Sequence, residues 1–143
     1  MMEADFDLRE VDRGFAELVR RGAEPRALFA ELKPDLRADQ IDHKKKQQGP
    51  EGRWAALDPD TRARRPRARR LLGRLSSAVA YKAGRDALTA TSRVKWSRAH
   101  QDGARVGNGA RLPARPFLWY SSRFLDLARD SAEHFLERVW GRQ

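Results

Sequence analysis

Three histidines, at positions 43, 100 and 134, are the side chains best suited to proton transfer or metal binding at neutral pH. They are far apart in the sequence, and none has a cysteine partner. Glu137 follows His134 by three residues, but two ligands do not make a metal site. This spacing is typical of a polar pair on a helix surface, so we predict no metal centre.

Motifs of known catalytic chemistry are absent. The sequence has no glycine-rich phosphate loop, no dinucleotide-binding fingerprint and no nucleophile elbow. It has no cysteine, which excludes disulfides, thiol catalysis and zinc–thiolate sites. Ser121 and Ser122 precede an amphipathic run, where we expect them to cap a helix. The sequence therefore favours a protein that is not an enzyme and that uses no cofactor.

Arginine is the most concentrated residue type with functional potential. The formal net charge is +10, and residues 43–74 carry eleven lysines and arginines against three carboxylates. Clustered guanidinium groups bind polyanions with release of counterions, although no aromatic residue is interleaved among the arginines of Arg62–Arg74 for base stacking. Two interpretations stay open, a solvated face and a surface that contacts DNA or an acidic protein. The candidates are Arg62, Arg64, Arg65, Arg67, Arg69 and Arg70.

A chain of 143 residues is expected to form one domain, residues 1–143. No run approaches the roughly 18 apolar residues that a membrane-spanning helix needs, so we expect no membrane contact. The first residues are acidic and include no apolar signal segment. We therefore expect the protein to assemble in the cytosol.

The first half of the sequence is predicted to be mainly helical. Phe6 and Leu8 alternate with charged residues, which indicates a short strand at the entry. A helix is expected over 11–21, and a second helix from Pro25 with an apolar stripe at positions 28, 29, 32 and 36. Pro34 should kink or divide this helix. The polar continuation, residues 37–48, is expected to stay helical.

Residues 49–60 are predicted to be a loop with Trp54 as its anchor and Leu57 as its other large apolar side chain. Asp58 and Pro59 have the form of an N-cap followed by a first helical residue, so a short helix should begin there and end before Pro66. After the arginines, residues 71 and 72 should return to the core.

Residues 75–96 change to a period of two, which predicts a β-hairpin that turns at 83–86. One face holds positions 75, 77, 79 and 81, and then 88, 90, 92, 94 and 96. A short helix should follow over 97–101 and end at Gly103. Asn108 and Gly109 are a tight-turn signal that could close a second, smaller hairpin.

Residues 112–119 must run extended, because Pro113 and Pro116 both forbid helix. The apolar residues 117–119 should dock the next element. That element is a helix over 121–140, with a stripe at 124, 128, 132, 135 and 139 that is widened at 125, 136 and 140. The predicted class is α+β, with N-terminal helices, a small antiparallel sheet and a long C-terminal helix packed on the sheet.

Four motifs in order carry a resemblance to one family. They are the glycine–proline loop with its tryptophan at 49–61, Leu-Leu-Gly-Arg-Leu at 71–75, the Ala-His-Gln-Asp-Gly run that ends the stretch 96–103, and Leu-Pro-Ala-Arg-Pro-Phe-Leu at 112–118. In this order and spacing the chain resembles the phage virion morphogenesis, or tail completion, proteins of contractile-tailed, Mu-like phages. The sequence departs from that pattern at Gly73, at Trp96 in place of tyrosine, and in its more basic arginine run.

The resemblance implies a structural virion protein that completes the tail, terminates it or joins it to the head. It implies an oligomeric ring, a hexamer by the sixfold symmetry of the tail, with tail tube, sheath or neck and connector proteins as partners. The protein would assemble in the host cytoplasm and reside in the tail or neck of a phage or of a phage-derived particle such as a gene transfer agent. The residues assigned to assembly or structure are Trp54, Leu57, Trp96, His100, Gln101, Pro113, Arg115, Pro116 and Phe117.

We expect His100, Gln101 and Arg115 to stabilise the fold through hydrogen bonds to loop backbone. The hairpin or the 49–60 loop would reach a neighbouring subunit, and the basic stretch would face an acidic neck or tube protein. The alternative is a small basic protein that binds DNA non-specifically through Arg62–Arg74, with an affinity that falls steeply with salt. A nuclease fragment is disfavoured, because the sequence shows no carboxylate cluster for a metal.

Overall fold

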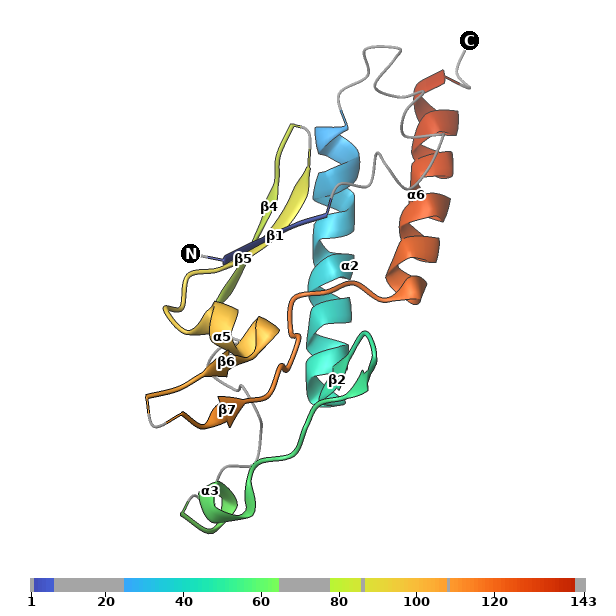
Figure 1. Ribbon diagram of the computed structural model, residues 1–143. Helices are drawn as coiled ribbons and strands as arrows, with labels where there is room; N and C mark the ends of the chain where they lie inside the picture. The colour runs from blue at the N-terminus through green and yellow to red at the C-terminus, as the bar shows by residue number, and fades with distance from the viewer. Residues whose placement is uncertain (1, 7–24, 65–77, 86, 108, 141–143) are drawn as a thin grey trace.

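The computed structural model describes residues 2–6, 25–64, 78–85, 87–107 and 109–140 (Figure 1). Several predicted features lie outside these ranges. They are the helix over 11–21, the Pro66 boundary, the return of residues 71 and 72 to the core, and positions 75 and 77 of the hairpin.

Helix α2, Arg26–Lys45, is the central element of the described fold. Its apolar stripe is fully buried at Leu28, Phe29, Leu32 and Leu36. Pro34 was expected to kink or divide this helix; it lies inside one continuous helix, so it does not divide it. Proline removes a single backbone donor, whereas the buried leucines at 32 and 36 hold the helix on both sides of it.

A three-stranded antiparallel sheet has the order β1 (Met2–Phe6), β5 (Leu88–Ser92), β4 (Val79–Ala83). The hairpin is thereby confirmed, although both of its strands are shorter than predicted. An entry strand is also present, but it lies at Met2–Phe6, whereas the prediction rested on Phe6 and Leu8, and residues 7–9 lie outside the described residues. Leu88, Ala90 and Ser92 of the central strand are buried and share one face, as the period of two requires.

Three layers follow one another in Figure 1, with α2 between the sheet and the C-terminal helix α6, Ser122–Trp140. The α+β class is confirmed. The prediction that the last helix packs on the sheet needs one correction, because α6 packs chiefly against α2, and α2 lies on β4 and β5. Two buried alanines of α6, Ala128 and Ala132, let the two helices approach closely.

The apolar stripe of α6 is buried from Phe124 to Phe135. Val139 was predicted to continue it but is 46% exposed. At this end of the helix, Arg138 instead forms an ion pair of 2.9 Å with Glu31 on α2, so a polar contact replaces apolar packing. The packed seam therefore ends one turn before the helix does.

Smaller elements lie toward the C-terminal end of α2, and α3 lies beyond it (Figure 1). The predicted loop contains a minimal hairpin and a short helix, which Asp58 begins by accepting a 3.4 Å hydrogen bond from the main chain of Asp60. The short helix predicted over 97–101 and the second hairpin, predicted from Asn108 and Gly109, are also confirmed. Gly109 has a positive φ of 82° in the turn of that hairpin. The elements are β2 (Gln48–Gly49), β3 (Gly52–Arg53), α3 (Pro59–Arg64), α5 (Ser97–Asp102), β6 (Ala104–Arg105) and β7 (Arg111–Leu112).

Candidate functional site

The extended stretch 112–121, here called the connecting segment, is where the separate parts of the fold meet. It leaves β7, passes the end of α2 and leads into α6. Its two prolines remove backbone donors and hold it extended, so its carbonyl groups need donors from elsewhere. Side chains from three separate regions, residue 54, α5 and α2, bond to its main chain.

The first region is the 49–60 loop. Trp54 is 7% exposed, and its indole Nε1 donates a 2.7 Å hydrogen bond to the carbonyl oxygen of Pro116. Arg115 of the connecting segment in turn donates to the loop: its Nε donates to Ala55 O at 2.8 Å and its Nη2 to Ala56 O at 3.0 Å. The loop and the connecting segment thus hold each other, and the predicted anchoring contact of Trp54 is confirmed.

The second region is α5. The side-chain oxygen of Gln101 accepts hydrogen bonds from the backbone N–H groups of Phe117 and Leu118, both at 3.0 Å. Its amide nitrogen donates to Leu118 O at 2.9 Å. One glutamine side chain therefore pairs with the backbone as a β-strand neighbour would. The predicted bonds of Gln101 and Arg115 to loop backbone are present.

His100 contacts the connecting segment through its main chain, since its carbonyl oxygen accepts a 2.7 Å hydrogen bond from Arg115 N. Its buried ring Nδ1 has no hydrogen-bond partner among the described residues. Burial lowers the pKa of this imidazole, and the nearby Arg115 guanidinium lowers it further. The predicted contact is thus made by the backbone of His100.

The third region is the last turns of α2, which the sequence analysis treated as a polar continuation. Asp39, Gln40 and His43 are all buried there. Gln40 donates a short hydrogen bond from Nε2 to Trp119 O, and Asp39 accepts from Ser121 N at 3.0 Å. Ser121 Oγ in turn accepts from Phe124 N at 3.1 Å, which confirms Ser121 as the cap of α6.

His43 completes this contact. Its ring stacks on Trp119 with centroids 4.3 Å apart, and its Nε2 lies 3.4 Å from Phe117 O. Burial lowers the pKa of His43, while the Asp39 carboxylate, 3.8 Å from Nδ1, acts in the opposite direction. A continuation of the apolar stripe by i+4 steps, from 28, 32 and 36 to 40, could have identified this buried polar face in the sequence.

The other predicted residues differ in their surroundings. Phe117 is fully buried, Leu57 and Pro116 are half-buried, and Pro113 is exposed. Trp96 was predicted to share one face of the hairpin with positions 88, 90, 92 and 94, and it is 65% exposed whereas 88, 90 and 92 are buried. Strand β5 ends at Ser92, so the period of two no longer applies at position 96, where the backbone (φ −98°) begins α5.

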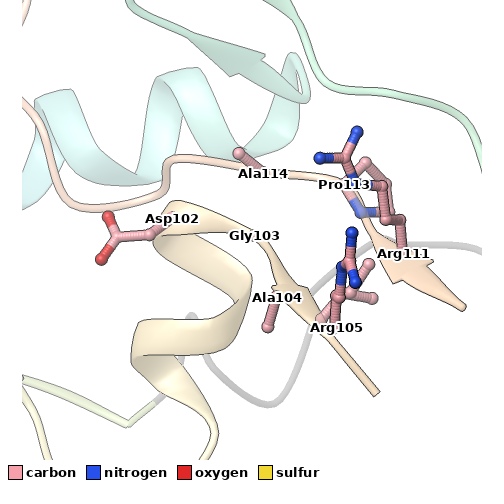
Figure 2. Close-up of a pocket in the computed structure, with 8 residues that line it drawn as sticks. Asp102, Gly103, Ala104, Arg105, Arg111, Pro113 and Ala114 are labelled. Atoms are coloured by element: carbon pink, nitrogen blue, oxygen red, sulfur yellow. The ribbon is translucent and has the colours of Figure 1, made fainter. Parts of the chain in front are cut away.

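The arginine run is described only in part. Arg62 and Arg64 are exposed on α3, and Arg65, Arg67, Arg69 and Arg70 lie outside the described residues. The β6–β7 hairpin adds two basic residues that the sequence analysis did not single out. Arg105 and Arg111 are direct cross-strand partners, both exposed. Figure 2 shows their side chains close together, with Asp102 on the opposite side of the view.

This hairpin borders an open cavity of about 540 Å³ with Gly103 and Pro113 on its wall. In the part of the chain that the structure describes, neither Arg105 nor Arg111 forms an ion pair, and Asp102 lies 3.6 Å from Arg98 instead. Like charges directly opposite on paired strands repel. Among the described residues, the pair therefore presents an exposed positive surface without a neighbouring carboxylate partner.

The whole of this framework falls within one sequence family. Residues 6–137 match the phage virion morphogenesis family. The chain belongs to that family. A comparison with curated proteins and one with solved structures each found no match.

A phage virion morphogenesis protein has a structural or assembly role in the phage particle. Across the described ranges, no group of three or more histidine, aspartate or glutamate side chains could hold a metal ion. None of the helices in those ranges has the length and apolar character required to cross a membrane. The polar side chains at the connecting segment of this virion morphogenesis protein bond the chain's own backbone.

Proposed function

We propose that this virion morphogenesis protein is a non-catalytic tail completion protein. It acts at the head-proximal end of a phage or phage-like tail, as a tail terminator or head–tail joining protein. It forms a closed ring, a hexamer that matches the sixfold tail. It assembles in the host cytoplasm and stays in the tail or neck of the virion.

The observation that supports this proposal is the use of the buried polar side chains. Trp54, Gln101 and Arg115 all bond to main-chain groups of the chain itself. Such contacts join the loops into one rigid body. A subunit that contacts several neighbours in a particle needs such a rigid body. A catalytic site would direct such groups toward a substrate.

A ring of identical subunits needs heterologous contacts that close. The framework holds several exposed features in fixed positions for such contacts. The tip of the β2–β3 hairpin is exposed, and so are Trp96 and the Arg105–Arg111 pair. Exposed aromatic and arginine side chains are the residue types enriched at protein interfaces. The partners proposed here are the tail tube, sheath, neck and connector proteins.

Electron microscopy of particles made with and without this chain tests the proposal. We expect tails without heads, or tails of irregular length, when the chain is missing, and recovery when it is supplied. Mass photometry of the purified protein should show the ring as a discrete species. Normal head–tail joining in the absence of the chain would contradict the proposal.

The Arg105–Arg111 pair also favours a second function, non-specific contact with DNA, together with Arg62 and Arg64. Each phosphate that an arginine neutralises adds about 0.9 to the slope of log affinity against log salt. Binding of duplex DNA at several salt concentrations therefore tests it. An Arg105→Gln, Arg111→Gln variant should lower the slope by about 2 if both residues contact phosphates. An unchanged slope would contradict this contact.

A further inference from the structure

The two edges of the three-stranded sheet differ in charge. Among the described residues, β1 and β4 each pair only with β5. The sequence of β1 places carboxylates at positions 3 and 5, whereas β4 carries Lys82. One edge is therefore acidic and the other basic. Within the described ranges neither edge strand has a second strand partner, so each could bond to a further strand.

A groove lies beside the β4 strand. A groove of about 450 Å³ runs between this strand and α2, lined by Lys33, Pro34, Arg37 and residues 79–81. Val79, Tyr81 and Ala83 on the core face of β4 are only half-buried, in contrast to the fully covered face of β5. Burial already raises the pKa of the Tyr81 phenol to about 12. An added strand would cover the remaining apolar surface of this edge.

The register of the sheet determines which positions of the two edges correspond. Met2 and Val79 are both opposite Ser92, and Phe6 and Ala83 are both opposite Leu88. Asp5 is therefore level with Lys82, because both are opposite Thr89. Since cross-strand partners share a face, positions 5 and 82 both belong to the outer face of the sheet. Positions 4 and 81, both opposite Ala90, belong to the core face.

We propose that β4 of one subunit accepts β1 of a second copy of this chain as a fourth strand, so that the sheet continues between subunits. Both strands run antiparallel to β5, and hence parallel to each other. Rotation about an axis along the strands preserves that direction, so β4 and the incoming β1 pair in parallel. An unstaggered repeat places Asp5 of the second copy beside Lys82 and Ala4 beside Tyr81.

Charge and pattern together favour a second copy as the occupant. The two edge strands, β1 and β4, are both five residues long and alternate between the faces of the sheet in the same way. They carry opposite charges at positions 5 and 82, which are both opposite Thr89. Such a contact is heterologous, since each subunit contributes its β1 edge to one neighbour and its β4 edge to the other. Repeated contacts of this kind form a closed assembly only when they close into a ring. This inference rests on the proposed ring and names the surface that builds it.

Cysteine cross-linking tests the pairing, because the native chain has no cysteine. Neighbouring strands lie about 4.8 Å apart, within the Cα separation of about 4.4–6.8 Å that a disulfide needs. Asp5→Cys and Lys82→Cys proteins are mixed and mildly oxidised. We expect a disulfide-linked dimer in the mixture and no such dimer with either variant alone. The double variant should give a ladder that ends at the number of subunits in the ring.

A matched control replaces Lys82→Cys by Arg105→Cys, an exposed position outside this sheet. It should give no dimer with Asp5→Cys. Charge reversal is a second measurement on the full chain. Lys82→Glu should reduce the ring population at least tenfold in mass photometry, and Asp5→Lys in the same chain should restore it. Circular dichroism of each variant verifies that it is folded.

The outcomes separate this inference from the proposed ring. A wild-type ring whose subunits give no Asp5–Lys82 cross-link would overturn the strand pairing and leave the ring intact. A ring that tolerates Lys82→Glu would also overturn it, and would assign Lys82 to protection of a free edge. A wild-type protein without any ring would contradict the proposed ring itself. Capture of an acidic peptide by β4, with no cross-link between copies, would overturn the choice of occupant.

Discussion

Trp54 and Pro116 are joined by a 2.7 Å hydrogen bond from the indole Nε1 to the proline carbonyl oxygen, across 62 positions of sequence. One residue earlier, Arg115 returns two hydrogen bonds to the residues that follow Trp54. Each partner therefore restrains the other. This reciprocal contact ties the 49–60 loop to the segment that leads into α6, and the first two predictions test it.

Trp54→Ala should lower the free energy of unfolding by about 3–5 kcal/mol, because it removes a buried aromatic ring and leaves a cavity. Trp54→Phe keeps an aromatic ring and removes the hydrogen bond, so we expect it to lower the free energy of unfolding by about 1–2 kcal/mol. Trp96→Ala is the control, since Trp96 is 65% exposed and should change stability by less than about 0.5 kcal/mol. Urea denaturation measures all three. Equal effects of Trp54→Ala and Trp96→Ala would show that Trp54 is not an anchor.

Arg115→Met should cost about 1–3 kcal/mol, because the carbonyl groups of Ala55 and Ala56 lose their donors. Arg115→Lys should recover only part of this loss, since a single ammonium group cannot reproduce the two-pronged guanidinium contact. Arg111→Met is the matched control on the exposed hairpin. Proteolysis of the 49–60 loop provides a second measurement, with faster cleavage expected for Arg115→Met. Unchanged cleavage would mean that Arg115 does not restrain the loop.

Gly103→Ala should destabilise the protein by about 1–3 kcal/mol, because Gly103 has a φ of 77°. An added Cβ would also lie 3.0 Å from both Leu112 O and Ala114 N, so the connecting segment would have to move. Gly107→Ala is the control in the same hairpin, where the new methyl group would have no atom within 4 Å. Thermal melting should separate the two variants. Identical melting temperatures would contradict the close approach.

Acid should weaken the contact between α2 and the connecting segment. The pKa of His43 is lowered from 6.5, chiefly by burial, so the unfolded chain binds a proton at a pH where the folded chain does not. The free energy of unfolding should therefore fall as the pH drops below about 6.5, until the pH passes the lowered pKa. His100, whose pKa is lowered in the same direction, adds to the effect.

Urea denaturation at pH 7.5, 6.5 and 5.5 measures this dependence. His43→Gln should lower stability at pH 7.5, because the stack on Trp119 is lost, and should flatten the dependence on pH. His134→Gln on the exposed side of α6 serves as the control for a histidine substitution. A His43→Gln variant with the full wild-type slope would exclude His43 as the titrating group.

Local patterns in the sequence determined most of the described elements. The period of two predicted the hairpin, Asp58 with Pro59 predicted α3, and the turn signal at Asn108 and Gly109 predicted the small hairpin. The motifs also identified the family, because their order and spacing can be read from the sequence without knowing any contact. Such features depend on neighbours along the chain, and the sequence displays those neighbours directly.

Tertiary structure alone decided which side chains meet. Asp39, Gln40 and His43 look like a solvated helix end in the sequence, yet they are buried, because the connecting segment passes over them and supplies their partners. Trp96 continues the alternation of Leu88, Ala90 and Ser92 in the sequence, yet it is exposed, because the strand ends before it. A hydrogen bond from a side chain to a main-chain carbonyl across 62 or 79 positions has no local signature. It forms because packing brings an unpaired carbonyl group to a donor, and burial then makes that pairing obligatory.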